Sequence, residues 1–290
     1  MNNSVFEDLK ILNLTSNSTR RLYNNRTRDV ESLNVWQDEV TGVIYIDDFY
    51  TGDESYVSSS YNSIVAKTNY EVAKDAERRF NMFLPLVSGK NIADFGCGSG
   101  AFLHLVKDHC GYVCGVELQQ NCVENLNTSG IDCFSDMEQI VDGSLDVCVS
   151  FHVLEHLPEP IKILKKIKNK IRKGGHLIVE VPHANDFLLS IMPLESFKQF
   201  TLWSPHLVLH NRLSITRLLQ HVGFGDIQIE GVQRYPLSNH LGWLYCGKPG
   251  GHKSPLSRID SPVLTEAYQN SLAKLDATDT LVVIARNEQV

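Results

Sequence analysis

The sequence has no apolar run that approaches the ~20 residues needed to span a bilayer. Its N-terminus has neither the basic start nor the apolar stretch of a signal peptide. It also has no excess of positive charge, because 27 Lys and Arg residues face 34 Asp and Glu residues, for a formal net charge of −7. The composition therefore gives no reason to expect binding to nucleic acid or an anionic membrane. These absences predict a cytoplasmic protein that acts on a small molecule.

The sequence also lacks a Cys-x-x-Cys pair, the spacing typical of zinc sites and of redox enzymes. It nevertheless has seven cysteines, an odd number, and they lie within the apolar pattern of the chain. We therefore expect buried free thiols in a reducing compartment. They are Cys97, Cys110, Cys114, Cys122, Cys133, Cys148 and Cys246.

The most informative motif is a glycine turn, Asp94–Gly100, with the sequence Asp-Phe-Gly-Cys-Gly-Ser-Gly. A short apolar run precedes it and a helical pattern of apolar residues follows, which predicts a strand, a tight turn and a helix. Gly96, Gly98 and Gly100 let the backbone bend and leave no Cβ between the turn and a bound molecule. Asp94 adds a carboxylate at the end of the strand. That charge suits a ligand with an ammonium group and a positive sulfur, such as S-adenosylmethionine.

The same glycines leave a second cofactor open. Gly96, Gly98 and Ala101 also fit the glycine fingerprint of dinucleotide-binding proteins, although a pyrophosphate favours bare amides or positive charge at the turn. The turn alone is therefore compatible with an NAD-dependent oxidoreductase. The residues at the ends of later strands are needed to distinguish S-adenosylmethionine from a dinucleotide.

Strand and helix patterns alternate after the glycine turn, which predicts an α/β fold with a mostly parallel, Rossmann-like sheet of seven strands and helices on both faces. A later helix at 214–221 precedes the last two strands, and the final strand is expected to close the sheet as its edge. The predicted strands are 92–95, 112–117, 131–134, 145–151, 176–181, 227–232 and 280–285, and the helices between the first five are 101–109, 120–128 and 159–171.

The chain divides into four predicted parts. Residues 1–62 form an N-terminal extension, with a polar, mobile segment at 13–28 and a hairpin from 33–37 and 43–46. The core spans 63–232 and begins with a helix at 63–86 that stops at Pro85. Residues 233–279 exceed the usual connection of about 4 to 6 residues, which predicts a lobe that covers substrate or contacts a second copy in a homodimer. Residues 280–290 return to the core.

Ligands of open parallel sheets bind beyond the carboxyl ends of the strands. Glu117 lies at the end of the second strand, where its carboxylate can accept both ribose hydroxyls, with Leu118 beside it. After the third strand, Asp136 can accept from an adenine amino group and Met137 can lie on the ring face. Phe151 ends the fourth strand, near the methionine half of the cofactor. The structural alternatives are a solvated acid at Glu117 and a loop acid beside a core methionine at Asp136 and Met137.

With these residues in place, the sequence resembles class I S-adenosylmethionine-dependent methyltransferases, over roughly residues 75–232 and again at the final strand. The resemblance rests on the glycine turn, Glu117, the Asp136-Met137 pair and residues 153–157, Val-Leu-Glu-His-Leu. It implies that the turn holds the methionine end of the cofactor, that Glu117 holds the ribose and that the pair holds the adenine. S-adenosylhomocysteine would be the product.

Segments around this core resemble bacterial family members that act in sugar modification and polysaccharide biosynthesis. They are 181–183, 204–207, 221–224, 233–240 and 247–252. The resemblance implies a hydroxyl of a sugar or glycan precursor, such as a nucleotide sugar, as acceptor. Some of those relatives carry a cysteine-rich zinc module near the N-terminus, whereas residues 28–50 contain no cysteine. Two alternatives stay open: a quinone-like phenol or another small molecule as acceptor, and a protein that binds the cofactor without turnover.

A hydroxyl is a weak nucleophile and benefits from a general base, for which histidine is suited near neutral pH. His152 follows the strand that is expected to end near the methyl group, and it is the first candidate. His183 follows the fifth strand and is the second. His206 and His210 lie in the region expected to cover the cleft. The alternative for each is a hydrogen-bonded structural role.

His152, Glu155 and His156 are spaced so that they share one face of a helix, where they could bind a divalent cation. Some quinone-pathway O-methyltransferases are similar at this point, with a carboxylate, Glu and His that bind metal. This sequence has His152 in place of the carboxylate. We therefore expect a structural Glu-His pair and predict no metal.

Aromatic and polar residues alternate in and near the insertion, a composition that suits a sugar ring and a nucleotide-sugar phosphate. The alternative is a surface lobe packed by its own aromatic side chains, or a dimer interface. The residues are Trp203, Tyr235, Trp243 and Tyr245, among Arg234, Asn239, His240, Lys248 and His252.

Overall fold

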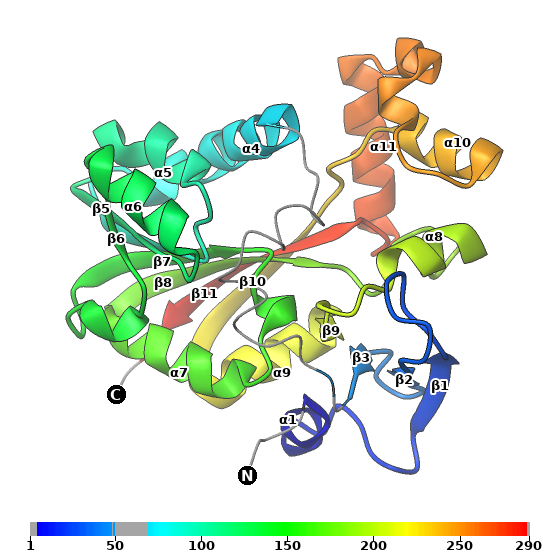
Figure 1. Ribbon diagram of the computed structural model, residues 1–290, viewed down its shortest axis with the longest axis horizontal. Helices are drawn as coiled ribbons and strands as arrows, with labels where there is room; N and C mark the ends of the chain where they lie inside the picture. Colours follow the sequence, from blue (N-terminus) through cyan, green and yellow to red (C-terminus); the bar gives the residue numbers. More distant parts are fainter. Residues whose placement is uncertain (1–4, 48, 50–68, 289–290) are drawn as a thin grey trace.

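The computed structural model describes residues 5–47, 49 and 69–288, and its centre is a seven-stranded sheet in the order β10-β11-β8-β7-β4-β5-β6 (Figure 1). Every strand runs parallel to its neighbour except β11, which is antiparallel to both β10 and β8. The predicted α/β fold is therefore confirmed. The strands are β4 (Asn91–Phe95), β5 (Tyr112–Val116), β6 (Asp132–Phe134), β7 (Leu145–Phe151), β8 (Ile171–Pro182), β10 (Phe224–Val232) and β11 (Thr280–Asn287).

Helices cover both faces of this sheet, and each face has its own apolar core (Figure 1). One face is covered by α4 (Asn69–Val87), α5 (Ala101–Val106) and α6 (Gln120–Thr128), and the other by α7 (Pro160–Lys170) and α9 (Arg212–Val222). Neighbouring residues of a strand enter opposite cores, as Leu177 and Ile178 of β8 do. This two-sided burial explains why the strands are almost continuously apolar in sequence.

The last strand lies inside the sheet, so the prediction that it forms the edge was wrong. β11 lies between β10 and β8, and β10 is the edge strand instead. The burial of the two strands gives the physical reason. Leu281, Val282 and Val283 are successive residues that are all buried, whereas β10 alternates between half-buried and exposed residues.

The N-terminal region contributes most of a second, four-stranded sheet in the order β1-β2-β3-β9. Its strands are β1 (Arg20–Asn24), β2 (Val35–Asp38), β3 (Ile44–Ile46) and β9 (Val208–Leu209), and α1 (Val5–Ile11) precedes them. The predicted hairpin is confirmed as β2 and β3. Within the segment 13–28, which was expected to be mobile, β1, a strand that the sequence pattern did not predict, pairs with β2. The Arg20 guanidinium lies over the rings of Phe6 and Trp36, which holds this polar strand in place.

Several predicted boundaries shift. α4 continues through Pro85 to Val87, and residues 63–68 of the predicted helix lie outside the described residues. β8 begins at Ile171, directly after α7, so it starts earlier than the predicted strand at 176–181. No described helix is long and apolar enough to cross a membrane.

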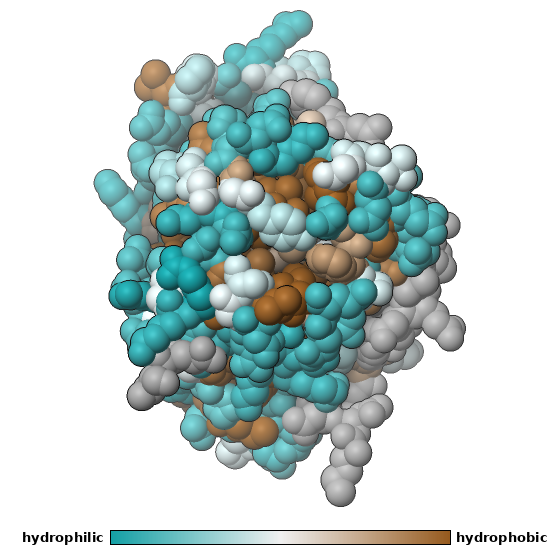
Figure 2. Space-filling view, turned by 90° about the vertical axis from the view of Figure 1, so that its left-hand side faces the viewer, coloured by the Kyte–Doolittle hydropathy of each residue, from teal (hydrophilic) through white to brown (hydrophobic). Residues whose placement is uncertain are grey.

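The carboxyl ends of the parallel strands face the region between α4, α8 (Glu195–Thr201) and the helices of residues 233–279, which are α10 (Leu237–Cys246) and α11 (Pro262–Lys274) (Figure 1). The opposite side of the molecule is mainly hydrophilic, with separate hydrophobic areas (Figure 2). The carboxyl-end side is therefore where ligand-binding residues are to be sought.

Candidate functional site

The glycine turn after β4 leaves open space at one position. Gly96, Gly98 and Gly100 have φ angles of 76°, 53° and 71°, in the left-handed region that favours glycine. A Cβ at Gly96 would lie 2.4 Å from the Val153 side chain, and one at Gly100 would lie 2.4 Å from Leu126. A Cβ at Gly98 would meet nothing within 4 Å. The turn is thus packed at both ends and open at Gly98, where a ligand can approach the backbone.

Glu117 lies directly beside this opening. Its Oε2 accepts a hydrogen bond from the Gly98 backbone N–H at 2.8 Å, and its Oε1 accepts from the Gln119 N–H at 3.0 Å. The next residue, Leu118, is 48% exposed. The carboxylate therefore joins the glycine turn to the residues that follow β5, and its role toward a ribose stays a prediction.

Asp94 is buried at the end of β4, with 3% of its surface exposed. Burial raises its pKa to about 7; the Arg79 charge opposes this shift, and Glu117 and Glu180 add to it. Its Oδ1 has no hydrogen-bond partner among the described residues. A buried carboxylate oxygen without a donor beside an open turn fits the ammonium group of a cofactor's methionine end.

Asp136 and Met137, which follow β6, are placed less favourably for contact with an adenine ring. Asp136 is exposed, and its side chain caps the 3-10 helix Met137–Gln139 by accepting from the Glu138 N–H at 2.9 Å. The Met137 side chain is 3% exposed and packs in one of the two main cores. These positions match the structural alternative of a capping acid and a core methionine. Their role toward an adenine ring stays a prediction.

Phe151 ends β7 in an aromatic group, with its ring stacked on Phe83 at 5.7 Å between centroids and edge-on to Phe102 at 5.2 Å. The Arg79 guanidinium lies 4.5 Å from the centroid of the same ring. Phe151 thereby positions the start of the segment that carries His152.

His152 is held from two sides. Its φ of 57° is in the left-handed region, a conformation that costs of order 1–3 kcal/mol for such a residue and is typical of functional sites. Its Nδ1 lies 3.3 Å from Glu155 Oε1, and its Nε2 lies 3.0 Å from Nη1 of Arg234. Because arginine can only donate, Nε2 is the acceptor, and Nδ1 carries the proton that is donated to Glu155. The contacts thus define one neutral tautomer.

Glu180 of β8 is fully buried, and its Oε2 lies 3.9 Å from Nε2 of His152. Its carboxylate lies 2.9 Å from Nη1 of Arg78 and 2.8 Å from Nε of Arg79, both on α4. Burial alone would raise the pKa of Glu180, but the charges of Arg79 and Arg78 outweigh it and lower that pKa. This buried ion pair fastens α4 to the sheet beside the site.

The sequence did not reveal four residues that complete this site, and it gave no sign that Arg234 contacts His152. The four are Arg78, Arg79, Glu180 and Asp279. The Arg234 Nε lies 3.2 Å from Asp279 Oδ1, and its backbone N–H donates to Oδ2 at 3.1 Å. One signal was available. Glu180 is the only charged residue in the run 177–182, Leu-Ile-Val-Glu-Val-Pro, of a strand expected to be buried.

The other predicted base, His183, is 1% exposed, and its Nδ1 donates to the Thr278 carbonyl at 3.1 Å. Burial lowers its pKa. His210 is also buried, with Nδ1 at 3.1 Å from Ser214 Oγ, and burial lowers its pKa to about 4. These contacts favour structural roles, and a catalytic role for His183 stays a prediction.

The remaining candidate histidine, His206, lies close to Glu155 and His156. One possible ligand atom of each of the three lies within 4.8 Å of the others. The set differs from the predicted one, because His206 takes the place of His152. The His156 Nδ1 donates to the Pro205 carbonyl at 2.8 Å, and burial lowers the pKa of His156 to about 4. The rings of His156 and His206 lie 4.9 Å apart, against Trp203.

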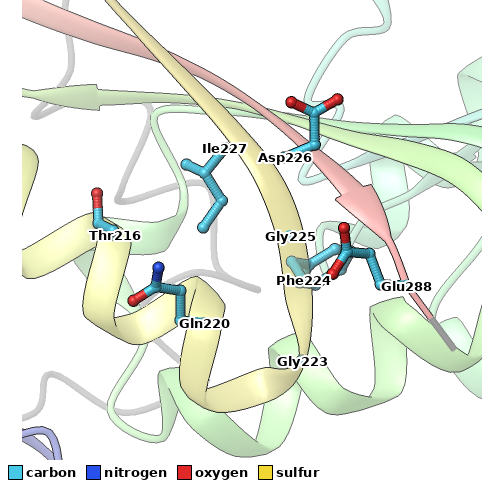
Figure 3. A pocket seen from close by; sticks show the side chains of 8 residues that line it. All are labelled: Thr216, Gln220, Gly223, Phe224, Gly225, Asp226, Ile227 and Glu288. Carbon is cyan, nitrogen blue, oxygen red and sulfur yellow. The ribbon is translucent and has the colours of Figure 1, made fainter. Parts of the chain in front are cut away.

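A separate pocket of about 480 Å³ lies near the start of β10, between that strand and α9 (Figure 3). It is at the amino end of the parallel strands, opposite the glycine turn. It contains none of the predicted site residues. Its lining consists of Thr216, Gln220, Gly223, Phe224, Gly225, Asp226, Ile227 and Glu288.

Comparison with known proteins identifies the class of this fold and site. Residues 65–229 match the sequence model of a family described as a methyltransferase domain, which is more than half of the chain. The chain therefore belongs to this methyltransferase family, and its cofactor is S-adenosylmethionine, as predicted. Asp94 and Glu117, together with the open space at Gly98, fit this cofactor.

Two curated relatives share about a quarter of their residues with this chain over the matched region. The chain is 26% identical over 121 residues to the ubiquinone biosynthesis O-methyltransferase of Ralstonia nicotianae, covering 38% of this chain and 51% of that protein. It is 26% identical over 135 residues to the tRNA (carboxymethyluridine(34)-5-O)-methyltransferase of Mus musculus, covering 44% of this chain and 20% of that one. The chain thus spans about half the length, or less, of these curated relatives.

Among solved structures, a SAM-dependent methyltransferase from Archaeoglobus fulgidus is similar with a TM-score of 0.51 and 19% identity. The match covers 74% of this chain and 94% of that chain. A likeness at this identity concerns the fold alone, and it agrees with the sheet order and the helices on both faces.

Because the pKa of Asp94 is raised to about 7, cofactor binding should depend on pH. Below that pH the carboxyl is mainly neutral and cannot pair with an ammonium group. We therefore expect the affinity for S-adenosylhomocysteine to rise between about pH 6 and about pH 8, measured by titration calorimetry. The Asp94→Asn variant should bind more weakly, with no rise over this range. A wild-type affinity that stays constant with pH would contradict the assignment of Asp94 to the ammonium group.

Proposed function

We propose that the protein transfers the methyl group of S-adenosylmethionine to a hydroxyl of a sugar or glycan precursor, with His152 as the general base. The observation that carries the proposal is the tautomer of His152, whose acceptor nitrogen Nε2 lies at the carboxyl end of β7. The following residue, Val153, packs against Gly96 in the glycine turn. The base and the cofactor turn are therefore adjacent.

The chemistry needs little beyond position and a proton acceptor. The cofactor supplies an activated sulfonium methyl, so alignment of the acceptor with that methyl provides much of the acceleration. His152 Nε2 would take the hydroxyl proton as the oxygen attacks. Glu155, which accepts from Nδ1, would stabilise the imidazolium that forms.

Arg234 acts in this proposal as a positioning residue. Its Nη1 donates to Nε2 of His152, the nitrogen that an acceptor hydroxyl would use. Asp279 restrains the rest of the guanidinium. An entering hydroxyl would replace one Arg234 N–H and leave His152 in the tautomer that accepts a proton.

Polar and aromatic side chains of residues 233–279 lie near His152, and they support a sugar acceptor. The Arg234 guanidinium lies 5.5 Å from the Tyr235 ring centroid, and that ring lies 5.2 Å from the ring of His252. The adjacent Lys253 binds Glu71 of α4 at 2.7 Å, which draws this part of the insertion toward the site. Aromatic faces with interleaved polar groups suit a sugar ring. The names of the curated relatives instead favour an oxygen of a ubiquinone precursor or of a carboxymethyluridine, so the acceptor is the point to test.

The test uses S-adenosylmethionine with a deuterated methyl group and two panels of acceptors, analysed by mass spectrometry. One panel contains nucleotide sugars and the other contains catechol-type phenols. We expect the label in at least one nucleotide sugar, with S-adenosylhomocysteine formed in equal amount. Label in the phenols alone would replace the sugar by a quinone-like acceptor, and binding of the cofactor without label in either panel would contradict both acceptors.

A further inference from the structure

Two cysteines that are 36 residues apart in sequence lie side by side at the cofactor turn. The Sγ atoms of Cys97 and Cys133 are 3.9 Å apart. Cys97 is in the glycine turn itself and is half-buried, whereas Cys133 is in β6 and is buried. The two thiols are therefore close enough that a small movement of the turn toward β6 brings the sulfur atoms to bonding distance.

A glycine provides the space in which the two thiols meet. Gly115 of β5 is the register partner of Cys133, and it is also paired with Asp94 of β4. A Cβ at position 115 would lie 2.5 Å from the Cys97 Sγ and 3.2 Å from the Cys133 Sγ. Any side chain there would separate the sulfurs, so the contact depends on glycine between them.

We propose that Cys97 and Cys133 are a redox modification site: a peroxide oxidises them to a disulfide, and the oxidised protein no longer binds S-adenosylmethionine. One thiolate attacks the peroxide O–O bond and becomes a sulfenic acid, while the released hydroxide takes up a proton as water. The second thiolate then attacks that sulfur and expels hydroxide, which also leaves as water. Two thiols and one hydrogen peroxide thus give one disulfide and two waters.

The disulfide inhibits binding because it moves the turn. Formation of the bond brings the sulfurs from 3.9 Å to about 2.05 Å. The turn next to Cys97 is held by the N–H of Gly96, which donates to Val116, and the N–H of Gly98, which donates to Glu117. A pull on Cys97 toward β6 acts on both bonds, and it changes the opening at Gly98 and the carboxylate assigned to the ribose.

The experiment compares reduced and hydrogen-peroxide-treated full-length protein. Titration calorimetry measures the affinity for S-adenosylhomocysteine, and peptide mapping after thiol alkylation identifies the cross-link. We expect a peptide pair joined through Cys97 and Cys133, an affinity at least tenfold lower than in reduced protein, and recovery of that affinity with dithiothreitol. Absence of the peptide pair, or a cross-linked protein with unchanged affinity, would overturn the proposal.

Two variants identify the disulfide as the cause. Cys133→Ser should form no cross-link and should retain its affinity after the same peroxide treatment; Cys133→Ala serves instead if the serine variant fails to fold. Cys110→Ser is the matched control, because the Cys110 thiol donates to the Val87 carbonyl away from the pair. It should cross-link and lose affinity as the wild type does. An equal loss in Cys133→Ser would assign the effect to oxidation of Cys97 alone and would also overturn the proposal.

Discussion

Replacement of His152 by alanine should lower turnover by about 10² to 10⁴-fold, the usual contribution of a positioned general base. The affinity for S-adenosylhomocysteine should change little, because the side chain of His152 contacts Glu155, Glu180 and Arg234, none of which is assigned to the cofactor. Turnover would be measured by mass spectrometry with the acceptor that the labelled-cofactor experiment identifies.

Two further variants make this result specific. His104→Ala removes an exposed histidine of α5, and its turnover should equal that of the wild type. Glu155→Gln keeps a hydrogen-bond acceptor for Nδ1 but removes the charge that would stabilise the imidazolium, and we expect an intermediate loss. Near-normal turnover in His152→Ala would show that another group, or none, takes the proton.

Replacement of Glu180 by alanine should lower the free energy of unfolding by about 3–5 kcal/mol, measured by urea denaturation. Glu180 is fully buried, and Arg78 and Arg79 are 22% and 13% exposed, so both guanidinium groups would lose their main partner in a poorly hydrated place. Because the pKa of Glu180 is lowered in the folded protein, its contribution is present above the pKa of the unfolded chain. It is lost as the pH falls through the folded pKa.

The matched control is an ion pair on the surface. Glu159 binds Lys162 at 3.0 Å, with 40% and 62% of the two side chains exposed. Glu159→Ala should change stability by no more than about 0.5 kcal/mol, since such pairs contribute little in water. If both variants lost the same small amount, the buried pair would not be what fastens α4 to the sheet.

Local sequence patterns predicted the features that depend on residues close together in the chain. The glycine turn, Asp94 and Glu117 follow directly from a strand, a turn and the next strand, so a short stretch of sequence contains the whole signal. The alternation of strands and helices is similarly visible in the apolar periodicity. In both cases each residue's role depends on near neighbours in the chain.

The features that sequence analysis missed depend on contacts between distant segments. Arg234 reaches His152 across 82 residues, and Arg79 reaches Glu180 across 101. Neither arginine differs in its local sequence from one exposed to solvent. The position of β11 inside the sheet also follows from strand order, which periodicity alone does not encode. Polar β1 was missed because pairing with β2 and stacking of Arg20 replace the apolar pattern that normally marks a strand.

The register of β10 and β11 has a consequence for how the segment between them can vary. Val232 and Thr280 are direct partners across the two strands, although residues 233–279 separate them in the chain. The whole segment therefore leaves and re-enters the sheet at one point, as the loop of a hairpin does. Such a loop can lengthen, shorten or be exchanged without a shift in the pairing of the strands. The sheet that carries the glycine turn and the segment 233–279, which contains Arg234 and Tyr235, can thus evolve at different rates.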